Sequence, residues 1–327
     1  MSSILYMIFY ILVFPGFIFC FLMGMLLSGI NRKLVARMQR RIGPPVIQPF
    51  YDFFKLMGKE RIIPKAAAKK AFVIAPIIAL VSVVTISLFI PIFSYTFVPD
   101  AADIIVILYL ITIPAVMVMA GGSSSASPYA GVGISREMVT MLSYELPLVI
   151  IFLTVGAKAG FALDGSVTFS LTKIGQYQGI SGIMLSHWTL IPAALAFLLI
   201  IPAEIGSVPF DVAEAETEIC EGPLVEYSGF YLAMYKLTQG IKMFIMASLF
   251  TALFIGGNGL GAITGSYILN MFLNTVIFVL IDIAVIMISV SFAKAVVARI
   301  KVEQTLKFFW TVPTALAVVS LILTYVA

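Results

Sequence analysis

The chain has 327 residues, of which 61% are hydrophobic and 11% are charged, and its formal net charge is +4. A soluble domain carries roughly 25% charged residues, so this composition excludes a soluble globular domain and predicts an all-α integral membrane protein. Cys20, Cys220 and the single histidine, His187, are too few and too scattered to form a metal site. We therefore expect no metal or cofactor in this chain, and no nucleic-acid partner.

Apolar segments recur along the whole chain, and each is long enough to cross about 30 Å of hydrocarbon. The first has no basic n-region and no small-residue cleavage site, so we expect it to be retained rather than removed as a signal peptide. We predict a single polytopic domain with about eight spanning helices, at residues 4–30, 71–94, 102–121, 135–157, 185–206, 227–256, 266–293 and 306–326.

Charge sets the expected orientation. The loop 31–70 carries eleven Lys or Arg residues against Asp52 and Glu60. By the positive-inside rule this loop is cytoplasmic, which places the N-terminus outside. The outer loops then hold the basic residues Lys158 and Lys173. Alternation puts the acidic segment of residues 209–226 on the cytoplasmic side, together with Arg136, Lys294, Arg299, Lys301 and Lys307.

Within the first loop, residues 48–59 (QPFYDFFKLMGK) place Phe50, Phe53, Phe54 and Met57 on one side of a helix. This pattern predicts an amphipathic helix that lies in the membrane interface or forms a lip over a cavity. The preceding segment RRIGPP is a basic, stiff connector. Either a lipid-facing anchor or a docking surface for a soluble partner accounts for basic residues beside aromatic ones.

The segment 121–133 (GGSSSASPYAGVG) is small and polar, and it reads as a flexible loop: a lid, a re-entrant segment or a linker. Arg136 and Glu137 open the fourth span, and an ion pair between them is expected near the interface. Glu145 follows eight residues later, about 12 Å farther along the helix axis. A carboxylate at that depth is costly and indicates a functional path.

The acidic segment holds six of the chain's sixteen acidic residues within sixteen positions. Pro209 at one end and Gly222-Pro223 at the other indicate a helix over residues 210–221. On such a helix Asp211, Glu214, Glu218 and Glu221 share one face. Like charges near lipid should have raised pKa values, as a proton path near pH 7 requires. The alternative is a capping box formed by Asp211 and Glu214 within a solvated loop.

Four further charged residues lie within or at the ends of apolar spans: Glu204, Lys236, Lys242 and Asp282. Intramembrane charge is expensive and is usually paired or functional. Most of the carboxylates therefore belong to the fourth to sixth spans.

Four stretches carry a family resemblance: MQRRIGPPVIQPFYDFFKLMGKE (38–60), MLSYELPL (141–148), PFDVAEAETEICEGPLVEYSG (209–229) and ARIKVEQTLKFFW (298–310). Together they resemble the H subunit of bacterial complex I and its relatives. Those relatives include the anchor subunits of membrane-bound NiFe hydrogenases, formate hydrogenlyases and archaeal ferredoxin-dependent complexes. The resemblance implies an eight-span fold, a seat for a hydrogenase-like redox module, and a carboxylate-rich route into the membrane.

By this resemblance, proton-path roles are expected for Glu137, Glu145, Glu204, Asp211, Glu214, Glu216, Glu218, Glu221 and Glu226. The basic residues expected to dock the soluble arm are Arg37, Arg40, Arg41, Arg299 and Lys301. The expected partners are hydrogenase-like large and small subunits, a ferredoxin-type iron–sulfur subunit, antiporter-like membrane subunits and the lipid bilayer. The NiFe centre and iron–sulfur clusters are expected in the partners, and the location is a prokaryotic cell membrane with the redox arm on the cytoplasmic side.

Three departures separate the branches of the superfamily. Quinone-reducing members usually carry Asn-Arg before the PFD motif, where this chain has Gly206 and Ser207. They carry Lys before the loop tyrosine, where this chain has Pro128, and Ala or Gly where it has Glu137. The resemblance is therefore to the hydrogenase-type branch, with the H-type protein of a quinone-reducing complex I or a sulfur-reducing complex as alternatives. A stand-alone secondary transporter should show repeated halves with paired broken helices, and no such repeat is visible.

Overall fold

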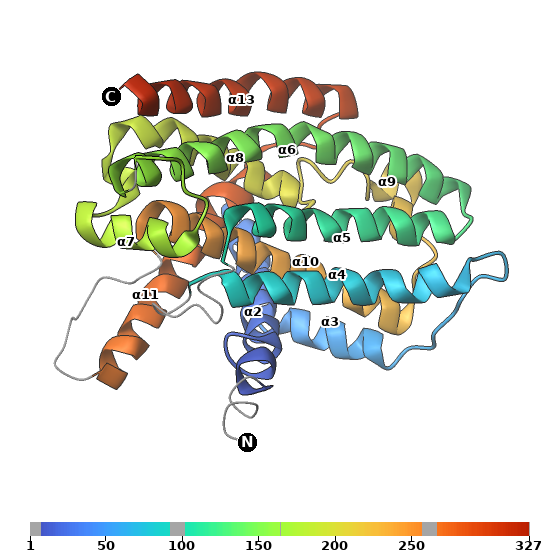
Figure 1. Ribbon diagram of the computed structural model, residues 1–327. Helices are drawn as coiled ribbons and strands as arrows, with labels where there is room; N and C mark the ends of the chain where they lie inside the picture. The colour runs from blue at the N-terminus through green and yellow to red at the C-terminus, as the bar shows by residue number, and fades with distance from the viewer. Residues whose placement is uncertain (1–7, 92–101, 164, 257–266, 327) are drawn as a thin grey trace.

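The computed structural model describes residues 8–91, 102–163, 165–256 and 267–326. Within these ranges the chain is mostly helical (Figure 1). The long helices are α2 (Phe17–Met38), α4 (Lys69–Phe89), α5 (Ile104–Ser124), α6 (Pro128–Leu163), α8 (Ile191–Glu204), α10 (Gly229–Phe250), α11 (Tyr267–Ile286) and α13 (Val302–Val326). Shorter helices are α3 (Gln48–Met57), α7 (Leu171–Ser181), α9 (Glu216–Ile219) and α12 (Phe292–Val296). Two π-helical segments, η5 (Thr251–Gly256) and η6 (Met287–Ser291), continue α10 and α11.

The prediction of an all-α membrane protein is confirmed. Seven helices of the described residues are long and apolar enough to cross a membrane, and Trp188–Glu204 is a shorter apolar helix. Each of these eight helices overlaps one of the eight predicted spans in sequence. The predicted limits at residues 4, 94 and 266 lie outside the described residues.

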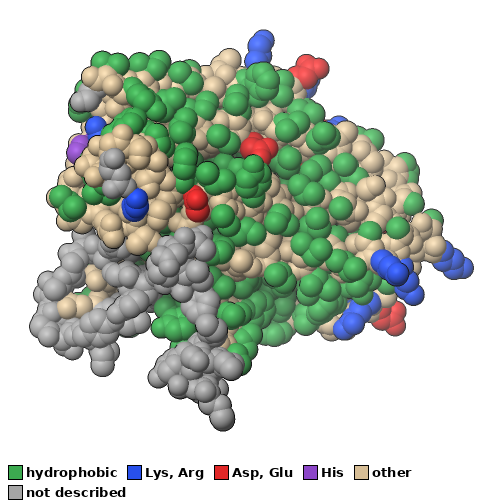
Figure 2. Space-filling model, viewed as in Figure 1, with side chains coloured by type: hydrophobic (Ala, Val, Ile, Leu, Met, Phe, Trp, Pro, Cys, Tyr) green, Lys and Arg blue, Asp and Glu red, His purple; other side chains and the backbone are tan. Residues whose placement is uncertain are grey.

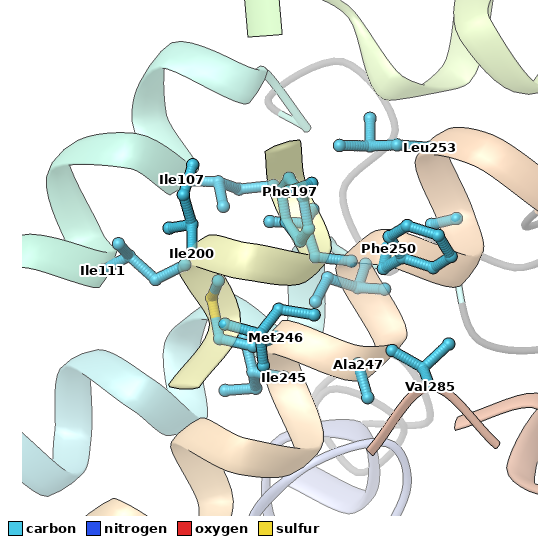
Figure 3. Close-up of a cluster of buried hydrophobic side chains, with 14 of the residues drawn as sticks. Ile107, Ile111, Phe197, Ile200, Ile245, Met246, Ala247, Phe250, Leu253 and Val285 are labelled. Atoms are coloured by element: carbon cyan, nitrogen blue, oxygen red, sulfur yellow. The ribbon is translucent and has the colours of Figure 1, made fainter. Parts of the chain in front are cut away.

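Helix α10 is the central helix of the bundle. Its residues from Ile241 to Phe250 are all buried, and it contacts α2, α4, α8 and α11. In a membrane the lipid is as apolar as the core, so close packing rather than apolar burial holds helices together. Gly24 of α2 illustrates this, because a Cβ there would lie 2.8 Å from the backbone nitrogen of Ile241. Figure 3 shows apolar side chains of α5, α8, α10 and α11, including Ile111, Phe197, Phe250 and Val285, meeting in this core.

The connecting segments gather at two opposite ends of the bundle. At one end, Ala68 N–H donates to Ser124 O and Ile300 N–H donates to Pro209 O, which joins the loops that were predicted to be cytoplasmic. At the other end, Ile104 N–H donates to Phe169 O, next to α7. Figure 1 shows α9 and α7 at these opposite ends. In Figure 2 hydrophobic side chains cover most of the face between them, and several Lys and Arg side chains lie at the end opposite the one where α7 lies. We refer to the end with α9 as the charged end.

The amphipathic helix predicted for residues 48–59 is confirmed as α3, whose Phe50 and Phe53 rings pack against Phe21 of α2 with centroids 5.7 and 5.2 Å away.

The prediction of a flexible loop over residues 121–133 is wrong, because α5 continues to Ser124 and α6 begins at Pro128. The small residues of this segment serve close packing instead. A Cβ on Gly133 would lie 2.5 Å from Pro223 Cδ.

The helix predicted for residues 210–221 is also wrong. Only Glu216–Ile219 is helical, and Cys220 and Glu221 adopt left-handed backbone angles with φ of 50° and 69°. The segment is held in this irregular path by groups from elsewhere in the chain, such as Ile300 N–H, which donates to Pro209 O. Those contacts replace the backbone hydrogen bonds that a helix would have supplied.

Candidate functional site

A cavity of about 500 Å³ opens at the charged end, bordered by α2, α3, α10, α12 and the acidic segment. Four basic and four acidic residues line it: Arg32, Lys236, Lys294, Arg299, Asp52, Asp211, Glu214 and Glu221. The acidic segment therefore delivers Asp211, Glu214 and Glu221 to one space, although it does so as an irregular loop and not as a helix.

Ion pairs organise most of these charges. Arg299 donates two hydrogen bonds to Asp211, from Nε to Oδ1 at 2.9 Å and from Nη2 to Oδ2 at 2.6 Å. Arg32 Nη1 lies 2.7 Å from Asp52 Oδ2 and joins α2 to α3. Lys236 Nζ lies 3.6 Å from Glu214 Oε2, a looser contact. The two-pronged Arg299 pair fixes the planes of both groups, which a lysine would not do.

A second cavity of about 60 Å³ shares Asp211, Glu214 and Lys236 with the first and reaches deeper into the bundle. Its inner wall holds Glu204 and Lys242, whose Oε1 and Nζ atoms lie 2.7 Å apart. Their side chains are 1% and 8% exposed, so this is a buried ion pair. Removing one partner of such a pair typically costs about 3–5 kcal/mol, because the other charge is left without compensation.

Glu137 of α6 lines the same small cavity as Glu204 and Lys242. The ion pair expected between Arg136 and Glu137 is not formed. Arg136 instead donates to Glu218 Oε2 at 2.5 Å, and this pair ties α6 to α9. Neighbouring residues on a helix point in directions about 100° apart, which explains why one faces the acidic segment while the other faces the interior.

The remaining predicted path residues are less centrally placed. Glu145 is partly exposed on α6, and Glu226 is half-buried and lines neither cavity. The Glu218 side chain is 55% exposed at its pair with Arg136. The side chain of Glu216 lies outside the described part of the structure. The proton-path roles of all nine carboxylates stay predictions.

Burial raises the pKa of the Glu214 carboxyl above its ordinary value, and the neighbouring Glu221 and Asp211 act in the same direction. Lys236 opposes the rise but does not cancel it. Because the side chain is still 27% exposed and lines both cavities, Glu214 can exchange protons with water there. It is therefore suited to take up and release a proton.

The residues predicted to dock a partner have different surroundings. Arg37 is exposed in the last turn of α2, Arg40 and Arg41 are exposed on the connector after it, and Lys301 is exposed before α13. Arg299 is engaged with Asp211 inside this chain. Their docking role also stays a prediction.

Chemically, this arrangement can bind, exchange and pass protons. Ionised carboxylates accept hydrogen bonds and neutral ones also donate them, and the two cavities place several carboxyl groups around spaces large enough for water. Among the described residues, no three His, Cys, Asp or Glu side chains come together as a metal site. His187 lies beside Tyr177, with Nε2 3.5 Å from the phenol oxygen, next to α7.

Sequence reasoning identified Lys236 and Lys242 as charged residues in a span but gave them no place in the site. The structure makes both of them lining residues. Their position in an apolar span carried a usable signal, since charge within a span is usually paired or functional. Arg32 and Asp52 gave no such signal, because their contact depends on how α3 folds back onto α2.

The fold and its charged end define a class: a polytopic helical membrane protein whose buried carboxylates and lysines adjoin cavities at one end of the bundle. A family model described as NADH dehydrogenase matches residues 10–325. The NADH-quinone oxidoreductase H subunit of Geobacillus kaustophilus is 36% identical over 314 residues, which cover 90% of this chain and 86% of that protein.

Two further comparisons come from other branches. Hydrogenase-4 component C of Escherichia coli is 34% identical over 232 residues, which cover 70% of each protein. In a solved structure of the membrane-bound sulfane sulfur reductase, an archaeal respiratory membrane complex, one chain is 30% identical, with a TM-score of 0.85 over 94% of this chain and 96% of that chain. The chain belongs to the NADH dehydrogenase family, whose members include the H subunit of complex I, and the superfamily resemblance read from the sequence is confirmed.

Proposed function

We propose that this chain is the membrane-anchor and proton-path subunit of an ion-translocating, ferredoxin-linked complex of the membrane-bound NiFe hydrogenase type. The observation that carries the proposal is the run of charged side chains from the large cavity, through the Glu214–Lys236 contact, to the buried Glu204–Lys242 pair. A chain that only anchored its partners would gain nothing from these expensive buried charges.

Each group has a task in this proposal. Arg299 holds Asp211 in place by two hydrogen bonds in the lining of the large cavity. Glu214 takes up a proton there, because its raised pKa favours the neutral form. The Lys242–Glu204 pair is the next proton-transfer site toward the interior, and Glu137 lines the same small cavity. A charge change in a partner seated over the large cavity would shift these equilibria, and Glu145 would carry the proton toward neighbouring membrane subunits.

The proposal of a hydrogenase-type complex, and not a quinone-reducing one, rests on two observations: the relatives that match this chain and the residue at position 207. Relatives from the hydrogenase and sulfur-reductase branches match most of the chain. Ser207 lines the large cavity and its hydroxyl donates to Pro202 O at 3.1 Å, so an arginine at this position would place a further positive charge in the cavity. Gly206 separates the quinone-reducing branch from the hydrogenase-type branch less well, because its φ of +68° suits both glycine and asparagine.

Quinone reduction by the complex is the second candidate. It is favoured by the 36% identity to a protein named for NADH-quinone oxidoreductase and by the size of the 500 Å³ cavity. Against it stands the lining, in which eight charged residues surround the space that a largely apolar quinone would have to enter. A sulfur-reducing complex is the closer alternative, since it requires no quinone site.

The exposed Arg37, Arg40 and Arg41 would seat the soluble arm on the cytoplasmic side, with the N-terminus outside. The partners would be hydrogenase-like large and small subunits, an iron–sulfur subunit and antiporter-like membrane subunits. The metal centres would belong to the soluble partners, so this chain would supply position and proton transfer and no redox group.

The test is purification of the complex in mild detergent through a tag on this chain, followed by metal analysis and protein identification. We expect nickel and iron to co-purify, and protons to be reduced to hydrogen when reduced ferredoxin is supplied as the electron donor. An Arg40→Glu and Arg41→Glu double variant should lose the metals while the membrane subunits stay together. Iron without nickel, together with reduction of a sulfur compound or a quinone, would overturn the hydrogenase assignment.

A further inference from the structure

A second polar site lies apart from the charged cavities. Asp282 of α11 is fully buried, and its two carboxyl oxygens meet the hydroxyl groups of Ser248 in α10 and Thr251 in η5. Ser248 Oγ lies 2.8 Å from Asp282 Oδ2, and Thr251 Oγ1 lies 2.7 Å from Asp282 Oδ1. Within the described residues, Asp282 forms no ion pair with any Lys, Arg or His. It lines neither of the two cavities.

The hydrogen atoms at this site can be counted. Thr251 Oγ1 also lies 3.1 Å from the backbone oxygen of Ala247, so the cluster contains three contacts at hydrogen-bond distance. Each hydroxyl carries one hydrogen, and the hydroxyls of Ser248 and Thr251 therefore supply two. An ionised Asp282 has none to give, which would leave one contact between two oxygen atoms without a hydrogen.

A protonated Asp282 completes the set. Its carboxylic acid hydrogen donates to Thr251 Oγ1, the Thr251 hydroxyl donates to Ala247 O, and the Ser248 hydroxyl donates to Asp282 Oδ2. All three contacts are then satisfied, and no uncompensated charge is buried. We infer that Asp282, Ser248 and Thr251 form a proton-binding site in which Asp282 is neutral, separate from the carboxylates at the charged end.

The surroundings of the site support this inference. From Met243, which lines the large cavity, to Ser248 is five residues of α10, about 7.5 Å along the axis. The intervening residues are apolar and buried, and Figure 3 shows Ile245, Met246, Ala247 and Val285 within the apolar cluster. An apolar layer therefore separates Asp282 from the large cavity, which disfavours an ionised carboxylate.

The backbone beside the site is also unusual. Thr251 is the first residue of the π-helix η5, and π-helical turns occur often at functional sites. Gln178 of α7 donates from Nε2 to the backbone oxygens of Ala252 at 3.0 Å and of Leu253 at 2.8 Å. The Gln178 side chain thus hydrogen-bonds two backbone carbonyls of η5, and the neutral Asp282 joins α11 to Thr251 in the first turn of η5.

Infrared difference spectroscopy tests the inference on the complex that purifies with this chain, reconstituted in lipid at neutral pH. The wild type should show a carbonyl band of a protonated carboxylic acid that Asp282→Asn removes. The band should move to higher frequency in Thr251→Val, because the acid loses its acceptor. Exchange of sodium for potassium should leave it unchanged. The matched control Asp103→Asn, at the partly exposed start of α5, should remove no such band.

The absence of this band, or an ionised-carboxylate band that responds to sodium, would overturn the inference and indicate a charged or sodium-binding Asp282. Thermal unfolding gives an independent measurement. Asparagine reproduces the donor and acceptor of a neutral Asp282, so Asp282→Asn should unfold close to the wild-type temperature while Asp282→Ala unfolds several degrees lower. Equal losses in both variants would contradict a neutral Asp282.

Discussion

Glu204 and Asp282 are both buried carboxyl groups in the same bundle, but their neighbours differ completely. Glu204 lies 2.7 Å from the Lys242 ammonium and borders a cavity, whereas Asp282 meets two hydroxyls in an apolar layer. The Lys242 ammonium compensates the charge of a carboxylate at its site. Hydroxyls without water stabilise the neutral acid. The partner, and not the depth of burial, therefore decides whether the charge of a buried carboxyl group is compensated.

The largest effect is expected from breaking the buried pair. Lys242→Met leaves Glu204 charged and without compensation, which should destabilise the folded chain by about 3–5 kcal/mol or force Glu204 to bind a proton. Thermal unfolding of the purified complex measures the loss. Adding Glu204→Gln should restore part of the stability. The matched control is Lys236→Met, whose partner Glu214 is 27% exposed and 3.6 Å away, and it should cost less. Equal losses would contradict the contrast between buried and cavity-facing pairs.

A smaller, pH-dependent effect is expected at Glu214. Because burial raises its pKa, the folded chain binds this proton more tightly than the unfolded chain does. Stability contributed by the neutral form is therefore lost as the pH rises from the ordinary glutamate pKa through the raised one. Glu214→Gln stays neutral throughout, so its unfolding temperature relative to the wild type should rise from mildly acidic to neutral pH.

An unfolding temperature of Glu214→Gln that runs parallel to that of the wild type over this range would mean that Glu214 has an ordinary pKa. Glu218→Gln is the matched control, since its side chain is 55% exposed and faces Arg136.

The smallest effect is expected at the surface pair of Arg32 and Asp52. Their side chains are 47% and 43% exposed, so Asp52→Asn should cost about 0.2–1 kcal/mol, less at high salt. Unfolding at low and high ionic strength measures this. A cost as large as that of Lys242→Met would show that α3 depends on the pair more than on its aromatic packing against α2.

The sequence predicted well what depends on local pattern. Runs of apolar residues located the helices, and the spacing of Phe50, Phe53 and Phe54 located α3, because both follow from helical periodicity. It failed where distant residues determine the backbone. The acidic segment has helix-like boundaries, but Arg136 and Arg299 hold Glu218 and Asp211 in positions that no helix would give them.

The candidate site was predicted in part. The carboxylates were found because charge is rare in apolar spans, and Glu204 and Glu137 do line the small cavity. Lys236 and Lys242, which pair with carboxylates of the site, were not assigned to it, since a lysine in a span gives no sign of which carboxylate it will face. The small residues at 121–133 were read as flexible because close packing against Pro223 cannot be seen without the fold.

The central claim is that cavity-facing carboxyl groups couple electron transfer to proton movement, and the ratio of ions translocated to electrons transferred tests it most directly. The measurement is ion uptake into vesicles alongside oxidation of a soluble electron donor, with Glu137→Gln compared with the control Asp103→Asn at the opposite end of the bundle. Glutamine keeps the shape and hydrogen bonding of glutamate but cannot exchange a proton. We predict that Glu137→Gln keeps most of the donor oxidation and loses most of the ion uptake, while Asp103→Asn retains both. An unchanged ratio in Glu137→Gln would contradict the account.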